Sequence, residues 1–347
     1  MRQVWIPRIG GPEVLEVREA PDPVPGPGEV RIRVAAAGIN FADVLARMGL
    51  YPDAPKLPAV VGYEVAGRID GVGTGVDGLP DGTRVLALTR FGGYSDVVVA
   101  PAALVAPVPE RLSLEQAAAL PVNYLTAWLM LVHLGNVRAG ERVLVHAAAG
   151  GVGQAAIQIC RWRGAQVIGT ASATKHARLA EMGVAHAIDY RTRDFEAEVR
   201  RITSGRGVDV VLDAVGGRSF ARSYRCLAPL GRLFVFGASS VAPGRRRSLL
   251  GAAATVLTMP SFKPLRLMRD NRGVFGVNVG HLSGEGPRLA AMLGEIVRLA
   301  GDGVFDPVVD RAFPFAAAGE AHGYIQARKN FGKVLLVPDG TPAAARR

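Results

Sequence analysis

Apolar and polar residues alternate in short runs over residues 1–120. Residues 13–40, EVLEVREAPDPVPGPGEVRIRVAAAGIN, hold two such runs joined by a Pro- and Gly-rich loop, and residues 60–73 and 84–88 continue the pattern. Alternation with a period of two, bounded by Gly and Pro, is typical of strands. The next stretch, SLEQAAALPVNYLTAWLMLV (residues 113–132), is predicted to be helical, with Ser113 as an N-cap. We therefore expect a β-rich N-terminal part that ends at this helical stretch.

From Arg142 onward, strand-like and helix-like runs alternate. The strand-like runs are RVLVH, QVIGTA, AHAIDY, VDVVLDAV, RLFVFG and VFGVNV, and helical runs such as GQAAIQICRWRG and KHARLAEMG lie between them. This alternation predicts a parallel sheet with right-handed crossovers. After Gly280 come a helical run, the strand-like DPVVDRAFPF, a second helical run and GKVLLVP. The fold class is thus α/β, with a β-rich part beside a doubly wound parallel sheet.

Length and charge set further bounds. A chain of 347 residues suggests two domains, since single cores rarely grow beyond roughly 250–300 residues. The formal net charge of +11 raises the possibility of nucleic-acid binding, but the basic residues are spread out and do not alternate with aromatic ones, so we expect no nucleic-acid partner. The densest basic patch is an insert formed by Arg245, Arg246, Arg247, Lys263, Arg266, Arg269 and Arg272. It is either a solvated face or a surface that contacts anions.

Cysteine use and hydropathy predict the compartment. The two cysteines, Cys160 and Cys226, are isolated, which argues against a disulfide framework and a cysteine-based zinc site. No signal peptide opens the chain, and the longest weakly polar run, residues 249–262, is too short to span a bilayer and contains Pro260. We expect a soluble cytoplasmic protein without a transmembrane segment.

The stretch HAAAGGVGQ, residues 146–154, lies between an apolar strand and an apolar helix. Ala148, Gly150 and Gly153 follow the spacing of the G-x-G-x-x-G motif, with Ala in the first place. Small residues there let backbone N–H groups approach a pyrophosphate, and the start of the helix favours negative charge. We predict a dinucleotide cradle. Its residues are Ala149, Gly150, Gly151, Val152 and Gly153.

The end of the second strand of such a unit selects between NAD and NADP. An Asp or Glu there would bind the adenosine ribose of NAD, but this chain has Ser172, with Lys175 close behind. A hydroxyl and an ammonium suit a 2′-phosphate, and Tyr190 at the end of the next strand is placed to cover it. We predict NADPH as the cofactor.

Six stretches in order carry a family resemblance: residues 38–52, 57–73, 120–131, 146–161, 209–217 and 332–338. With them the chain resembles a medium-chain dehydrogenase/reductase of the zinc-free quinone oxidoreductase branch. Residues 169–195, FGVNVGHL and the basic insert resemble the synaptic-vesicle membrane protein VAT-1 homologues within it. The resemblance implies a GroES-like catalytic domain from residues 1–122 and 281–347, a Rossmann NADPH-binding domain over 123–280, and an active-site cleft between them.

Zinc-dependent members of the superfamily have a Cys where this chain has Asn40, and a His where it has Tyr63 before Glu64. Neither an amide nor a phenol replaces a thiolate or imidazole ligand, so we predict no metal. Alcohol oxidation then lacks its Lewis acid. Hydride transfer to a quinone or an α,β-unsaturated carbonyl depends less on a metal ion, because conjugation stabilises the developing oxyanion.

The resemblance also implies the residues of the acceptor site. Tyr51 corresponds to a tyrosine near the substrate carbonyl in enoyl reductases and Asn40 to the branch's active-site Asn, so both are candidate catalytic residues. Tyr63, Asn123 and Tyr124 are the candidate substrate-binding residues. A packing role for Tyr51 beside Pro52 remains the alternative. His146, His281 and His322 are interpreted as structural or surface histidines rather than general acids.

The nicotinamide end of the cofactor should meet strand ends. Phe236 and Gly237 follow one predicted strand, where such sheets bind ligands. The resemblance adds Thr126 and Asn278 at the nicotinamide, and Asn330 near the 2′-phosphate, with Lys329 as the alternative there.

The last Rossmann strand is the usual dimer edge of the family, so we predict a homodimer. The predicted function is an NADPH-dependent reductase of a quinone or α,β-unsaturated carbonyl; these residues do not separate the two acceptors. The alternative is an NADPH-binding protein whose main role is contact with a membrane or partner through the basic insert.

Overall fold

A computed structural model describes residues 1–242, 244 and 247–340. The chain divides into two compact units. Unit 1 comprises Met1–Leu125, Gly244–Arg247 and Gly280–Arg347, and unit 2 comprises Thr126–Pro243 and Ser248–Val279. Arg245 and Arg246 of the basic insert and the tail 341–347 lie outside the described residues.

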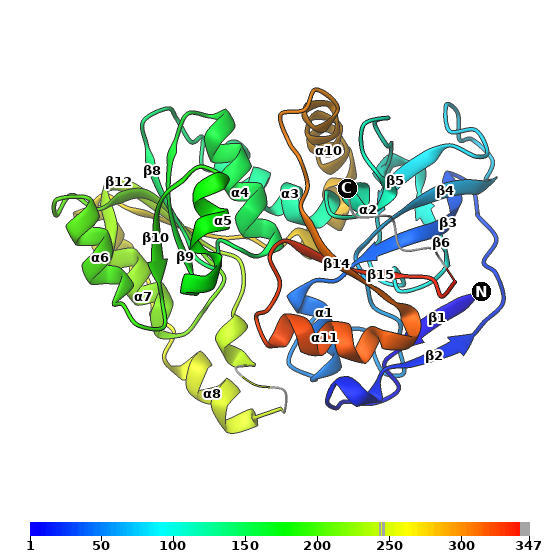
Figure 1. The fold of residues 1–347 in the computed structure, drawn as a ribbon, viewed down its shortest axis with the longest axis horizontal. Coiled ribbons are helices and arrows are strands. Elements are labelled where there is room, and N and C mark those ends of the chain that lie inside the picture. The colour runs from blue at the N-terminus through cyan, green and yellow to red at the C-terminus, as the bar shows by residue number, and fades with distance from the viewer. Residues whose placement is uncertain (243, 245–246, 341–347) are drawn as a thin grey trace. The chain divides into compact units, whose positions relative to one another are not determined.

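Unit 1 is built on a mixed sheet in the order β14-β15-β3-β4-β5-β7, with β6 paired to β3, and on the antiparallel pair β1-β2 (Figure 1). The strand bounds are β1 Arg2–Trp5, β2 Glu16–Glu19, β3 Glu29–Gly38, β4 Glu64–Val72, β5 Arg84–Leu88, β6 Val97–Pro101, β7 Val105–Pro107, β14 Val309–Pro314 and β15 Lys333–Val337. Its helices are α1 Phe41–Arg47, α2 Leu114–Ala118, α10 Gly286–Gly301 and α11 Ala318–Gln326. The β-rich N-terminal part is confirmed.

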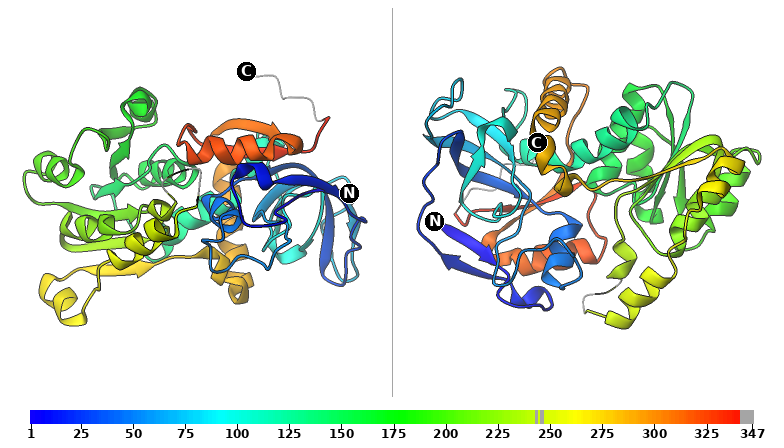
Figure 2. Two further views of the ribbon diagram at one scale, coloured as in Figure 1. Left: turned by 90° about the horizontal axis from the view of Figure 1, so that it is seen from below. Right: turned by 180° about the vertical axis from the view of Figure 1, so that it is seen from behind.

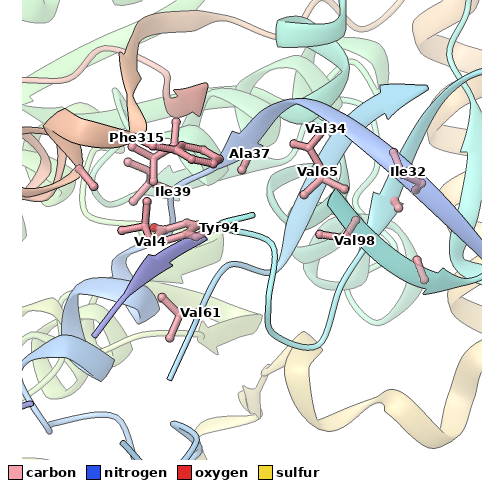
Figure 3. Packing of buried hydrophobic residues seen from close by; sticks show 14 of the residues in the cluster. Val4, Ile32, Val34, Ala37, Ile39, Val61, Val65, Tyr94, Val98 and Phe315 are labelled. Carbon is pink, nitrogen blue, oxygen red and sulfur yellow. The ribbon is translucent and has the colours of Figure 1, made fainter. Parts of the chain in front are cut away.

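The core of unit 1 lies where the alternating strands turn their apolar faces inward. Along β3, Val30, Ile32 and Val34 are buried while the residues between them are more exposed. They belong to one buried cluster with side chains from distant parts of the chain, such as Tyr94 and Phe315. Figure 3 shows Phe315 beside Ile39, and Val34 beside Val65. Because these contacts join the N- and C-terminal stretches, both are needed to complete one hydrophobic core.

Unit 2 is a parallel sheet in the order β10-β9-β8-β11-β12-β13, with helices on both faces (Figure 2). The strands are β8 Arg142–Val145, β9 Gln166–Ala171, β10 Val184–Asp189, β11 Val208–Asp213, β12 Leu227–Val235 and β13 Gly273–Gly276. The helices are α4 Gly151–Trp162, α5 His176–Glu181, α6 Phe195–Ile202, α7 Arg218–Arg225, α8 Leu249–Leu257 and α9 Pro264–Asp270. The predicted α/β class with a doubly wound parallel sheet is confirmed, and β13 forms one edge of it.

The stretch over residues 113–132 is helical, as expected, and it is divided into two α-helices. Ser113 caps α2 by accepting from the Gln116 N–H, as expected, but α2 ends at Ala118. A second helix, α3 Pro121–Trp128, starts at the proline. Proline lacks the N–H that would continue the first helix and is well suited to a first helical position, so Pro121 separates the two.

Candidate functional site

The predicted cradle lies at the junction of β8 and α4 in unit 2. The chain leaves β8 at Val145, passes through Ala147 with a positive φ of 51°, and closes a turn in which Gly150 N–H donates to Ala147 O at 2.9 Å. Helix α4 then starts at Gly151. The turn thus joins the end of β8 to the first residues of α4 within five residues, Ala147 to Gly151.

Gly153 fits this junction because it has no side chain. A Cβ at this position would lie 2.5 Å from Ala147 O and 2.7 Å from Ala148 Cα, both backbone atoms. The glycine thus lets α4 sit directly on the turn, with free N–H groups and the positive end of a twelve-residue helix at one point. These residues fit the pyrophosphate of a dinucleotide.

His146 has a structural role, as expected. Its ring is buried, with Nδ1 3.2 Å from Thr170 Oγ1 and Nε2 3.0 Å from Ser223 Oγ. Burial lowers the pKa of His146, and the nearby Asp213 carboxylate opposes this shift. The imidazole therefore fixes the end of β8 beneath the cradle.

The residues predicted to select NADP over NAD follow the carboxyl ends of strands in the same sheet. Ser172 follows β9 and Tyr190 follows β10. In the sheet, β9 lies between β8 and β10, and the three strands are parallel. Ser172 is buried, with Oγ 3.3 Å from Thr174 Oγ1, and Lys175 lies in the next turn. The structure thus brings a hydroxyl, an ammonium and a phenol to the end of the sheet that holds the cradle.

Three of the four nicotinamide candidates lie at the carboxyl ends of β12 and β13, in the other half of the sheet. Phe236 and Gly237 follow β12, and Asn278 follows β13 by two residues. Phe236 N–H donates to Asp213 O at 3.2 Å, which ties the end of β12 to that of β11. Thr126 lies on α3 and is almost fully buried.

Unit 1 contains a pocket of about 320 Å³ that brings together two of the predicted residues, Tyr51 and Tyr63. Its other lining residues are Asp53, Arg90, Phe91, Gly280 and His281. The Tyr51 and Tyr63 rings meet edge-on with centroids 6.5 Å apart, and the Tyr63 and Phe91 centroids are 5.3 Å apart. An aromatic wall with polar groups around it suits a planar, conjugated ligand.

Tyr63 contributes a buried polar group to this wall. Its Oη is buried and has no hydrogen-bond partner of normal geometry among the described residues. Burial raises the pKa of Tyr63 well above its usual range, and the neighbouring Asp43 and Tyr51 raise it further. The phenol therefore keeps its proton and can donate a hydrogen bond to a ligand oxygen in the pocket.

Asn40 belongs to a buried ionic cluster rather than to the lining of this pocket. Its Oδ1 accepts from Lys333 Nζ at 2.8 Å, and its Nδ2 donates to Glu64 Oε1 at 3.0 Å. Lys333 also contacts Glu64 Oε1 directly, and the two side chains are only 3% and 0% exposed. Because both ends of the amide are engaged, the geometry supports a positioning role for Asn40; its predicted catalytic role stays a prediction.

A second buried carboxyl, Asp43, adjoins this cluster. It accepts from Asn40 N–H at 2.7 Å and from Gly62 N–H at 3.2 Å, and Tyr94 Oη is hydrogen-bonded to it. The Tyr94 hydroxyl in turn lies 3.2 Å from Nε2 of the buried His322. Burial lowers the pKa of His322, so this histidine is a structural one, as expected.

Burial raises the pKa of Asp43 from 3.8 to about 7. The folded state thus binds a proton that the unfolded state releases near pH 4, so this group makes the free energy of unfolding fall as pH rises between about 4 and 7. We expect Asp43→Asn to remove that slope. Urea unfolding of both proteins across this range should show the variant gaining up to about 3 kcal/mol relative to the wild type. Parallel pH profiles would contradict the assignment.

The remaining candidates lie inside unit 1. Asn123 Nδ2 donates to Ala119 O at 3.2 Å, and the Tyr124 ring packs 5.3 Å from Phe305; both side chains are buried. Asn330 Nδ2 donates to Gly332 O at 2.9 Å. None of the three lines the aromatic pocket, and their predicted binding roles stay predictions.

Sequence reasoning missed Asp53, Arg90 and Phe91, and it interpreted His281 as a structural or surface histidine rather than a general acid. The structure joins His281 Nε2 to Asp53 Oδ2 at 2.7 Å on the pocket wall. The signal for Phe91 and Arg90 was weak, because they lie in a loop after β5 without a recognisable motif. Across the described ranges, no group of three His, Cys, Asp or Glu side chains is placed to hold a metal ion, and no helix is long and apolar enough to cross a membrane.

The comparisons with known proteins agree with this architecture. Residues 26–110 match the alcohol dehydrogenase GroES-like domain, and residues 182–336 match the zinc-binding dehydrogenase family. Among solved structures, quinone oxidoreductase from Escherichia coli, complexed with NADPH, superposes with a TM-score of 0.86 at 32% identity, covering 97% of this chain and all of that one. CurK enoyl reductase superposes with a TM-score of 0.84 at 31% identity, covering 97% and 99% of the two chains.

The chain is thus a medium-chain dehydrogenase/reductase of the quinone oxidoreductase branch. The synaptic vesicle membrane protein VAT-1 homolog of Rattus norvegicus is 43% identical over 325 residues, which are 93% of this chain and 80% of the relative. Within the branch, the chain belongs to the family of these VAT-1 homologues.

Proposed function

We propose that the protein is an NADPH-dependent reductase that transfers a hydride to a quinone or an α,β-unsaturated carbonyl without zinc. The observation that carries the proposal is the cradle at Gly150–Gly153, followed at the next strand end by Ser172 and Lys175 in place of an acidic residue. The NADPH complex of the E. coli relative and the enoyl reductase relative support it.

NADPH, when bound, supplies the hydride. The cradle amides from Ala149 to Gly153 bind its pyrophosphate, and Ser172, Lys175 and Tyr190 bind the 2′-phosphate, with Asn330 or Lys329 as further contacts there. Side chains and strand ends at the nicotinamide orient it for transfer. They are Thr126, Phe236, Gly237 and Asn278.

In the pocket of unit 1, Tyr63 donates a hydrogen bond to the acceptor oxygen, which gains negative charge during hydride transfer. Tyr51 lies beside Tyr63 in the same pocket wall. The interior of unit 1 supports this wall through the buried cluster of Asn40, Glu64 and Lys333. The Lys333 ammonium, 2.8 Å from Asn40 Oδ1, places a fixed positive charge at the position that carries a zinc ligand in zinc-dependent relatives. A like charge disfavours a metal cation there. These features support a reaction without zinc.

The reaction is tested with menadione and cyclohexenone as acceptors. We expect one mole of acceptor to be reduced for each mole of NADPH oxidised, and the rate to survive dialysis against a chelator. Loss of activity on chelation, restored by zinc, would contradict the zinc-free part of the proposal alone.

Lys175→Ala tests the cofactor choice. The variant should bind NADPH more weakly by about 1–3 kcal/mol, the value of one charge-assisted contact, and NADH almost as well as the wild type does. Fluorescence titration with both nucleotides measures this. Arg178→Ala, one turn further along α5, is the matched control. Equal losses for NADPH and NADH would refute the phosphate contact.

We also propose that two copies pair through β13, because this strand leaves one edge of the sheet open. Phe275 on β13 is partly exposed at that edge. Sedimentation equilibrium at micromolar concentration should give a dimer. A monomer at every concentration would remove this proposal.

A second candidate function, contact with an anionic membrane surface, is favoured by one observation on unit 2. Large apolar side chains stand 57–86% exposed on two helices beside basic ones. The apolar residues are Leu249, Leu250, Val256 and Leu257 on α8 and Leu265 and Met268 on α9, and the basic ones are Lys263, Arg266 and Arg269. Apolar groups that insert and cations that pair with headgroups are the two parts of interfacial binding.

Arg272 of the basic insert is not part of this surface. It donates to Tyr224 O at 3.2 Å and lies over the Tyr224 ring, so it stabilises unit 2. Co-sedimentation with phosphatidylserine vesicles should be lost in the triple variant Lys263→Ser, Arg266→Ser, Arg269→Ser and in high salt. Equal binding by wild type and variant would refute this candidate, and would leave the reductase proposal untouched.

A further inference from the structure

The aromatic pocket of unit 1 carries an ion pair that the reductase proposal has not used. His281 Nε2 lies 2.7 Å from Asp53 Oδ2, and both residues line the same pocket as Tyr51 and Tyr63. The His281 side chain is 60% exposed, so it is in contact with solvent as well as with the pocket. Residues 53 and 281 are far apart in the sequence, and the fold of unit 1 brings them together.

Reduction of a quinone or an enone needs a proton as well as a hydride. Tyr63 is a poor source of that proton, because burial and the nearby Asp43 hold its pKa far above neutral. Arg90, the other cation of the lining, does not lose a proton in a protein. His281 is the histidine of the lining, and an imidazole can act as a general acid.

We propose that His281, oriented by Asp53, is the proton donor to the acceptor in this pocket. The inference rests on the proposed reductase function and deepens it. The hydride, with the electron pair of the C–H bond that breaks in NADPH, would form a C–H bond at the β-carbon of an enone or an O–H bond at the first oxygen of a quinone. An N–H bond of the imidazolium breaks, the proton forms an O–H bond on the acceptor oxygen, and the ring keeps the electron pair. Water at the exposed side returns the proton to His281.

The arrangement assigns distinct tasks to the two nitrogens. Nε2–H donates to Asp53, which fixes the orientation of the ring, and Nδ1–H is the proton to be given up. The charged and titratable groups that face the ring in the lining are Asp53, Arg90, Tyr51 and Tyr63. Asp53 is the anion among them, so it is a positioning residue for this step.

The test compares His281→Gln with the wild type in the full-length protein, with menadione and saturating NADPH across pH. A proton donor acts only in its protonated form, so wild-type kcat should be higher at acid pH than at alkaline pH. In the variant, kcat should be lower by about 100-fold at acid pH and approach the wild-type value at alkaline pH. His186→Gln, at an exposed histidine on β10 of unit 2, is the control and should match the wild type.

Asp53→Asn gives a second check, because the ring loses the partner that orients it, so kcat should fall at acid pH and stay near the wild-type value at alkaline pH. An equal loss of kcat in His281→Gln at every pH, or no loss at all, would overturn the inference. If the wild type oxidises NADPH with neither acceptor, the proposed function fails instead, and a binding measurement then decides about His281.

That measurement is a nitrogen-15 NMR titration of the imidazole signals with menadiol in the absence of NADPH. The His281 signal is assigned as the one missing in His281→Gln. It should shift on binding, whereas the His186 signal should not. Menadiol binding, detected by calorimetry, that leaves the His281 signal unmoved would overturn the inference whatever the outcome of the activity assay.

Discussion

Gly153→Ala should weaken NADPH binding on the order of 100-fold, although it adds only one methyl group. The new Cβ would meet two backbone atoms, Ala147 O at 2.5 Å and Ala148 Cα at 2.7 Å, and neither can move without opening the turn. The start of α4 would then shift away from the end of β8, and the amides that face the pyrophosphate would lose their common direction. Fluorescence titration with NADPH measures the loss.

The same substitution at Gly294 is a matched control. Gly294 lies inside helix α10, and a Cβ there would have no neighbour within 4 Å. Alanine in the middle of a helix is favoured over glycine by about 0.5–1 kcal/mol, so Gly294→Ala should stabilise the protein and leave NADPH affinity unchanged. If Gly153→Ala bound NADPH as tightly as Gly294→Ala does, residues 149–153 would not be the cradle.

Lys333→Met should destabilise the protein by about 3–5 kcal/mol. The variant leaves the fully buried carboxylate of Glu64 without its cation, and it also removes the donor to Asn40 Oδ1. Glu64 Oε2 further accepts from Val122 N–H at 2.7 Å, so the start of α3 is tied to the same ion pair. Urea unfolding followed by circular dichroism measures the change.

The double variant Lys333→Met, Glu64→Gln separates charge burial from lost packing. A neutral amide keeps the volume of Glu64 without a buried unpaired charge, so the double variant should recover at least half of the lost stability. If it were less stable than Lys333→Met alone, the cost would come from packing, and the ion pair would not be what stabilises the cluster.

The part of the proposed site that binds the nucleotide could be predicted from the sequence, because its residues follow one another along the chain. A strand, a turn of small residues and a helix follow each other within residues 142–162, and the structure has β8, the turn and α4 there. Ser172 could be found in the same way, since a strand end fixes its place. Residues 113–132 were also predictable as helical, although the apolar pattern alone does not show the division that the structure has at Pro121.

The part of the proposed site that binds the hydride acceptor could be predicted only in part. Tyr51 and Tyr63 were found by resemblance, and the pocket brings them together. His281 and Asp53 meet through the folding of unit 1, and no local pattern indicates that contact. The role of Lys333 was hidden for the same reason, since a lysine at the start of an apolar strand is usually exposed. Its burial becomes evident only when β15 pairs with β3 beside Asn40 and Glu64.

The most direct test of the account is the consumption of NADPH by the purified protein, followed by its absorbance with menadione or cyclohexenone and compared with NADH. The account predicts saturable oxidation of NADPH that depends on one of these acceptors, is much slower with NADH, and is lost in Gly153→Ala. Binding of NADPH without oxidation in the presence of either acceptor would contradict the reductase, and would favour a protein that binds NADPH and acts through its exposed α8 and α9 surface.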